Sequence, residues 1–133
     1  NYLDNIKRIK PINNKILICP GLHDGDSLLN KVYPLVKENL DSVFIFKPHP
    51  RSSIFKNGIP EKYKIDNLRI GTKHISSYLD SVSEIIFTYS SVGQEAHSLG
   101  IKVKIVCLPN KINESPLLDI YDRSDDSLIK VLW

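Results

Sequence analysis

Short, almost continuously apolar runs alternate with longer amphipathic stretches along this chain. The clearest runs cover residues 15–19 (KILIC), 43–47 (VFIFK), 84–88 (EIIFT) and 102–107 (KVKIVC), and a shorter one covers 67–70. Strands that are apolar on both faces lie inside parallel sheets, because helices cover both faces of such sheets. The pattern therefore predicts an α/β fold: a Rossmann-like parallel sheet with helices on both faces.

The amphipathic stretches predict helices between these strands. In residues 26–40 the apolar side chains recur at helical spacing, at Leu28, Leu29, Val32, Val36 and Leu40. Pro34 lies within this stretch and predicts either a kink or the start of a second helix. Further helices are expected over 74–83, 90–99 and 125–132. Gly100 should end the helix over 90–99 in the left-handed conformation.

Composition narrows the class of partner. The formal net charge is +3, without any basic block, which argues against nucleic acid and is compatible with an anionic ligand. No apolar run approaches the roughly 20 residues that span a bilayer. Cys19 and Cys107 form no CxxC pair, so we expect buried thiols and neither zinc nor another cofactor. The chain lacks methionine, and we expect it to be a fragment of a longer protein.

Parallel α/β sheets bind ligands beyond the carboxyl ends of their strands. Tyr89, Ser90 and Ser91 follow one predicted strand and open a helix, where free N–H groups and a partial positive charge suit a phosphate. Ser91 with Gln94 also fits a capping box, which needs no ligand. Glu95, one turn later, would accept hydrogen bonds from ribose hydroxyls or simply complement the helix dipole.

Lys47, Pro48, His49 and Pro50 end another predicted strand. The prolines fix the backbone around His49, and a rigidly placed imidazole suits proton transfer or phosphate contact. The alternative is a purely structural histidine. Lys47 and Pro50 are counted with the substrate-binding residues, as is Gly21, which closes the first strand.

The segment His23-Asp24-Gly25-Asp26 precedes the first long helix. Asp26 is predicted to be the N-cap of that helix. Asp24 is not needed as a helix cap and is the candidate general base. Gly25 would allow a tight turn beside it. A metal site built from His23, Asp24 and Asp26 is the less favoured alternative, because nothing in the spacing fixes its geometry.

These residues together resemble a known pattern. Phe46 to Pro50, then Thr88 to Ala96, then Gly100 before a strand, are similar to the C-terminal, nucleotide-binding half of GT-B glycosyltransferases. More narrowly they resemble bacterial sialyltransferases and polysialyltransferases, which share His-Pro and Ser-Ser motifs and an acidic-acidic-Gly motif. Here only one acid, Asp24, precedes the glycine.

The resemblance implies a function. His49 would be the general acid or would contact the CMP phosphate, Ser90 and Ser91 would bind that phosphate, and Asp24 would deprotonate the acceptor. Residues 1–14 would be an extension or linker and 15–133 the nucleotide-sugar-binding domain. The expected activity is transfer of a sialic-acid-like sugar from a CMP-linked donor to a cell-surface glycan.

The resemblance also implies partners, and it leaves alternative functions open. An N-terminal half of the same enzyme would complete the protein, which we expect to be cytoplasmic, with possible peripheral membrane association. The alternatives are a CDP-polyol phosphotransferase of teichoic-acid or capsule type, a non-catalytic sugar-nucleotide binding module, and a nucleotide-sugar epimerase.

Overall fold

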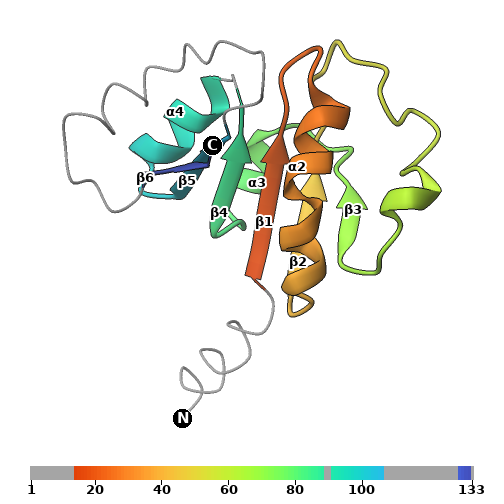
Figure 1. Ribbon diagram of the computed structural model, residues 1–133. Helices are drawn as coiled ribbons and strands as arrows, with labels where there is room; N and C mark the ends of the chain where they lie inside the picture. The colour runs from red at the N-terminus through yellow and green to blue at the C-terminus, as the bar shows by residue number, and fades with distance from the viewer. Residues whose placement is uncertain (1–13, 89–90, 107–128, 133) are drawn as a thin grey trace.

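The computed structural model describes residues 14–88, 91–106 and 129–132. All strands pair in parallel in one six-stranded sheet, in the order β3-β2-β1-β4-β5-β6 (Figure 1). The strands are β1 (Asn14–Cys19), β2 (Ser42–Phe46), β3 (Leu68–Ile70), β4 (Glu84–Phe87), β5 (Lys102–Val106) and β6 (Ile129–Leu132). The helices are α2 (Gly25–Glu38), the 3-10 helix η2 (Glu61–Tyr63), α3 (Ser76–Leu79) and α4 (Ser91–Ser98). The predicted Rossmann-like α/β fold is confirmed.

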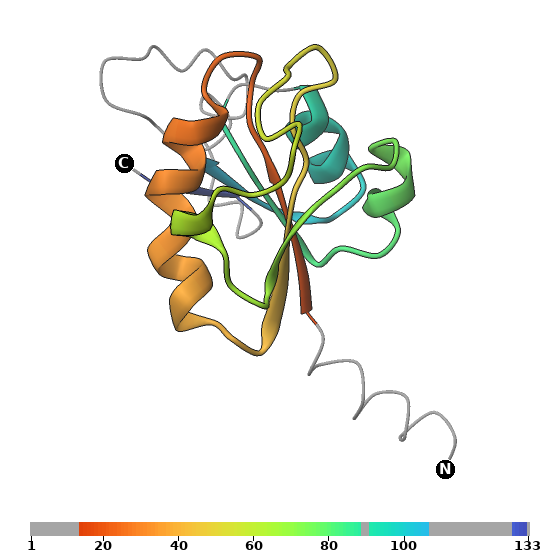
Figure 2. The same ribbon diagram turned by 90° about the vertical axis from the view of Figure 1, so that its right-hand side faces the viewer.

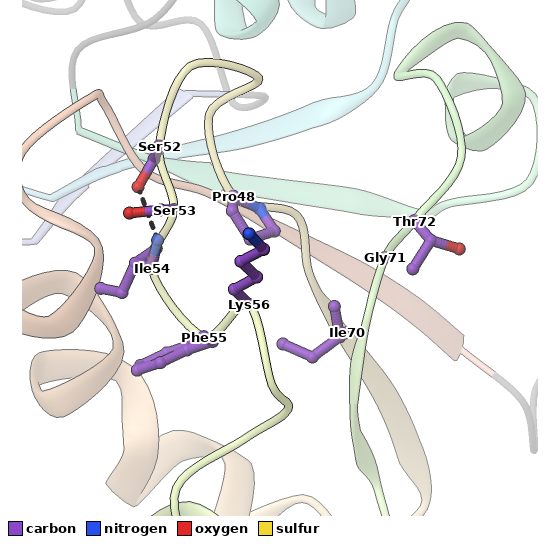
Figure 3. A pocket seen from close by; sticks show the side chains of 9 residues that line it. All are labelled: Pro48, Ser52, Ser53, Ile54, Phe55, Lys56, Ile70, Gly71 and Thr72. Atoms are coloured by element: carbon purple, nitrogen blue, oxygen red, sulfur yellow. Dashed lines mark hydrogen bonds between the residues drawn. The ribbon is translucent and has the colours of Figure 1, made fainter.

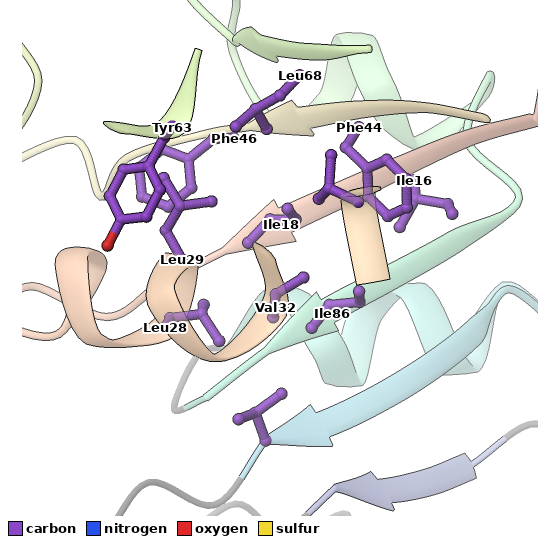
Figure 4. Packing of buried hydrophobic residues seen from close by; sticks show 12 residues of the cluster. Ile16, Ile18, Leu28, Leu29, Val32, Phe44, Phe46, Tyr63, Leu68 and Ile86 are labelled. Carbon is purple, nitrogen blue, oxygen red and sulfur yellow. The ribbon is translucent and has the colours of Figure 1, made fainter. Parts of the chain in front are cut away.

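Helices cover both faces of the sheet, as the apolar strands predicted. Figure 2 shows α2 on one side and α3 and α4 on the other. Alternate residues of β1 point to opposite faces. Ile16 and Ile18 therefore pack in a cluster with α2 (Figure 4). Leu17 and Cys19 pack in the cluster on the other face, which includes residues of α3 and α4.

Helix α2 is one helix and not two. It runs from Gly25 to Glu38 through Pro34. Pro34 is exposed, so water can bond the carbonyl that loses its helical partner there. Its N-cap is Asp24, so the prediction that Asp26 is the cap is wrong: Asp26 lies within the first turn.

The predicted helix over 125–132 is wrong in the part that the structure describes. Residues Ile129–Leu132 form β6, which pairs with β5 in the register Val103↔Ile129. The pairing satisfies backbone groups of β5 that an edge strand would leave open. The alternation of Ile129, Lys130 and Val131 is a strand pattern that the helical interpretation overlooked.

Helix α4 ends as predicted. Gly100 has a φ of 81°, and the amide of Ile101 donates to the carbonyl of Ala96 at 3.0 Å. This is the bonding pattern of a helix that stops at a left-handed glycine. Among the described residues, no helix is long and apolar enough to cross a bilayer.

The strand order reverses between β1 and β4. From β1 the chain proceeds to β2 and β3 on one side, and from β4 to β5 on the other. The loops that leave β1 and β4 therefore diverge at their carboxyl ends, on the upper edge in Figure 1. In open α/β sheets this is the point where ligands bind.

Gly71, which follows β3, provides a test of this packing. A Cβ added there would lie 2.8 Å from Cγ2 of Ile45 and 3.0 Å from the hydroxyl of Tyr78. We expect Gly71→Ala to lower the free energy of unfolding by about 1–3 kcal/mol in urea denaturation, because neither neighbour can move without disturbing the core. Ser77→Ala, on the exposed side of α3, is the control and should change stability little. An unchanged midpoint for Gly71→Ala would contradict the close packing of α3 on the sheet.

Candidate functional site

Asp24 joins the two loops at the point of strand reversal. Its Oδ1 accepts a hydrogen bond from the amide of Gly21 at 2.6 Å, and its Oδ2 accepts one from the hydroxyl of Thr88 at 2.6 Å. Gly21 follows β1, and the buried Thr88 follows β4. The carboxylate thus fastens the carboxyl end of one central strand to that of the other.

Lys47 places a positive charge near the same edge. Its amide donates to the carbonyl of Ile18 at 2.9 Å, which extends the pairing of β2 with β1 by one residue. Its half-buried side chain lies close enough to Cys19 to act on the thiol. Burial raises the pKa of Cys19 to about 12, and the Lys47 ammonium opposes part of that rise. The Lys47 charge therefore lies near the carboxyl end of β1.

His49 is held in a tight turn. Its Nδ1 accepts a hydrogen bond from the amide of Arg51 at 3.1 Å, and its carbonyl accepts one from the amide of Ser52 at 2.9 Å. A neutral imidazole that accepts at Nδ1 carries its proton on Nε2. The half-buried ring thus offers Nε2–H as a donor, which suits contact with an anionic oxygen.

A pocket of about 390 Å³ lies beside this turn, between the loops that follow β2 and β3 (Figure 3). The first loop contributes most of its lining and the second the rest: Pro48, Ser52, Ser53, Ile54, Phe55, Lys56, Ile70, Gly71 and Thr72. Hydroxyls, an ammonium and apolar side chains thus surround one cavity. The sequence analysis assigned no role to Ser52 and Ser53, although two serines beside the His-Pro motif were a usable signal.

The wall of the pocket is anchored through aromatic rings. Phe55 adopts a φ of 55°, which is costly for a bulky residue. Its ring lies 5.3 Å from that of Phe46 and 6.3 Å from that of Tyr63, between centroids. Cδ1 of the neighbouring Ile54 lies 3.0 Å from the position that a Cβ on Gly25 would take. Packing on β2, η2 and α2 therefore holds a strained loop in place.

The predicted site residues come to one edge of the sheet. Gly21 and Asp24 follow β1, and Lys47, His49 and Pro50 follow β2. Helix α4 begins at Ser91, so a helix N-terminus follows β4 as predicted. Glu95 lies on α4 and is exposed.

Part of the predicted site lies outside what the structure describes. Ser90 lies outside the described residues, and the side chains of Ser91 and Gln94 are not described. The predicted capping box therefore stays a prediction. His23 is exposed, and no three metal-binding side chains of the described residues gather into a possible metal site.

The Rossmann-like α/β fold of this chain matches one half of GT-B and sugar-nucleotide epimerase folds. MnaA of S. aureus, solved with UDP, superposes with a TM-score of 0.59 at 14% identity, over 85% of this chain and 32% of that one. KpsC of Thermosulfurimonas dismutans matches in two structures. Its β-Kdo 2,4 transferase gives a TM-score of 0.53 at 16% identity, over 72% of this chain and 34% of that one. Its β-Kdo 2,7 transferase gives a TM-score of 0.50 at 19% identity, over 80% of this chain and 42% of that one.

The likeness is one of fold. The chain spans about a third of the length of MnaA and of the 2,4 transferase. No protein-family model and no curated protein sequence matches it.

The burial of the Cys19 thiol at the end of β1 can be tested by chemical labelling. With the pKa of Cys19 raised from 9.0 to about 12, the folded state keeps the thiol proton more tightly than the unfolded state does. The stability from this group is complete below pH 9.0 and is lost as the pH rises towards about 12. We therefore expect Cys19 in a Cys107→Ser variant to resist a disulfide reagent at pH 8.

The control for that labelling is the same variant unfolded in urea, which should react fully. Rapid stoichiometric labelling of the native protein without urea would contradict a buried, protonated Cys19.

Proposed function

We propose that this domain binds the CMP portion of a CMP-linked sugar, as the donor-binding half of a glycosyltransferase that acts on a cell-surface glycan. One observation carries the proposal. The parallel strands bring the loop after β1, the His49 turn and the start of α4 to the same carboxyl edge of the sheet, whose order reverses between β1 and β4. The fold likeness to two Kdo transferases supports the choice of reaction class.

Electrostatics favour an anion at this edge. Residues 47–56 contain Lys47, Arg51 and Lys56 and no acid. The nearest acid on the neighbouring loop, Asp24, already accepts two hydrogen bonds. The amides in the first turn of α4 add the positive end of a helix dipole. A phosphate bound here would meet donors and positive charge and little repulsion.

The pocket supports a nucleotide and not a lone phosphate. It opens beside Pro48, next to His49, and combines the Phe55 and Ile70 side chains with the hydroxyls of Ser52 and Thr72. A cavity with apolar walls and a few polar groups is typical of sites for small organic ligands. In this proposal the phosphate lies towards His49 and α4, and the nucleoside lies towards the pocket.

The chemistry follows from these positions. Breaking the bond between the sugar and the phosphate leaves negative charge on the departing CMP. The Nε2–H of His49, the ammonium of Lys47 and the amides at the start of α4 would stabilise that charge. Ser90 and Ser91 would add hydroxyl donors, and Glu95 would bind the ribose. The acceptor glycan and the other half of the enzyme would complete the site.

A UDP-sugar epimerase is the second candidate. Its support is MnaA, whose structure with UDP gives the higher TM-score of 0.59. A CDP-polyol phosphotransferase would use the same phosphate contacts. The nucleotide that binds separates these functions, because the fold is common to them.

Calorimetric titration of the chain with CMP, CDP and UDP tests the proposal. We expect CMP to bind, and to bind more tightly than UDP, because the donor carries CMP. Tighter binding of UDP would favour the epimerase, and tighter binding of CDP the polyol phosphotransferase. Absence of heat with all three would overturn the proposal.

His49 offers a matched comparison with His74. In each case Nδ1 accepts the amide two residues later, from Arg51 at 3.1 Å and from Ser76 at 3.2 Å. Replacement by alanine removes this local bond in both, and at His74 it also removes a contact of Nδ1 with the Ser76 hydroxyl at 3.0 Å. We expect His49→Ala to weaken CMP binding by about 1–3 kcal/mol, because a donor to phosphate is lost. His74→Ala, in the loop after β3, should leave CMP affinity unchanged, and equal effects of the two would contradict the assignment.

A further inference from the structure

We propose that Asp24 is a positioning residue: its carboxylate clasps the loop after β1 to the end of β4 and thereby sets where α4 begins. The inference deepens the proposed function, because the start of α4 is where the phosphate is proposed to bind. It differs from the role of general base that the sequence resemblance implies for Asp24.

The clasp joins segments far apart in the sequence. Thr88 and Asp24 are 64 residues apart, yet the Thr88 hydroxyl lies 2.6 Å from Oδ2. The bond connects the carboxyl ends of β1 and β4, the two strands between which the sheet reverses. Helix α4 starts at Ser91, soon after Thr88. A shift of Thr88 would therefore shift the N-terminal amides of that helix.

The other oxygen fixes the opposite side of the crevice. Oδ1 accepts the amide of Gly21 at 2.6 Å, and the carbonyl of Asp24 accepts the amide of Leu28 at 2.8 Å as α2 begins. One residue thus orders the loop after β1, starts α2 and restrains the end of β4. A side chain at position 25 would crowd this loop, because Cδ1 of Ile54 lies 3.0 Å from a Cβ built on Gly25.

These contacts oppose a role as base. A general base must take a proton on an oxygen that faces the acceptor hydroxyl. Here each oxygen already faces a donor, Gly21 or Thr88. Protonation of either oxygen would weaken the bond that the same oxygen accepts, so each catalytic cycle would loosen the clasp. The base is thus expected elsewhere in the complete enzyme.

Four variants separate the two roles. Asp24→Asn can keep both contacts, because its Oδ1 accepts from Gly21 and its Nδ2 donates to the Thr88 hydroxyl, but it is not a base. Asp24→Ala removes both contacts. Thr88→Val removes the hydroxyl donor with little change of shape, whereas Thr88→Ser retains it.

The expected pattern follows from the contacts. We expect Asp24→Ala and Thr88→Val each to raise the Kd for CMP about tenfold or more, and Asp24→Asn and Thr88→Ser to change it less than about threefold. The double variant Asp24→Ala/Thr88→Val should bind no worse than Asp24→Ala, because both changes open the same clasp. In an enzyme with both halves, Asp24→Asn should keep most of its turnover.

A ligand-free measurement keeps this inference separate from the proposed function. The amide of Gly21 should be protected from hydrogen exchange in the wild type and in Asp24→Asn and exposed in Asp24→Ala, while circular dichroism confirms folding. Equal protection in Asp24→Ala would overturn the clasp, whether or not CMP binds. Loss of turnover in Asp24→Asn, with CMP affinity intact, would instead assign the base role to Asp24. Failure of the wild type to bind CMP, with the protection pattern as expected, would count against the proposed function alone.

Discussion

The parallel pairing of β1 with β4 is the constraint on which the rest of the structure depends. Both strands are buried on both faces, and Leu17, Ile18, Ile85 and Ile86 have no solvent exposure. The pairing Ile16↔Glu84 through Cys19↔Phe87 brings together two chain segments that then diverge to opposite sides. A crevice at their carboxyl ends follows from this topology before any side chain there is considered. The side chains then determine what the crevice accepts.

Acidic, basic and aromatic side chains have different roles in the loops around the crevice. A charged group, Asp24, is used internally, where it ties Gly21 to Thr88. Positive groups on the next loop, such as Lys47 and Arg51, have no acid beside them in residues 47–56. Aromatic packing of Phe55 holds that loop in a strained conformation next to the pocket. Rigid support of an unbalanced positive charge is what binding of an anionic ligand requires.

Sequence reasoning predicted much of the fold because apolar strands and amphipathic helices carry strong periodic signals. The strands β1, β2, β4 and β5 fall within a residue of the expected bounds. The errors came where a pattern was short. The helix predicted over residues 129–132 is wrong, because their strand alternation covers only four residues and becomes decisive only through the pairing with β5. The prediction of Asp26 as the helix cap is wrong, because either aspartate satisfies the local rule for a cap.

The edge of the sheet on which the candidate residues lie was predictable, whereas their contacts were not. The loops after β1, β2 and β4 follow from the rule for parallel sheets, and His49 lies where the motif suggested. The bond between Asp24 and Thr88 spans 64 residues, so the spacing along the chain gave no sign of it. The pocket between the loops after β2 and β3 was missed for the same reason, since its walls meet only in the folded chain.

Amide-resolved NMR during titration with CMP tests the central claim, that the edge at the reversal of the sheet is the binding site. We expect chemical-shift changes concentrated in the loops after β1 and β2 and at Thr88 and the start of α4. Amides at the opposite edge, such as those of Asp41 and Ser83, should not move. Changes confined to that opposite edge, or shifts spread evenly over the sheet, would contradict it.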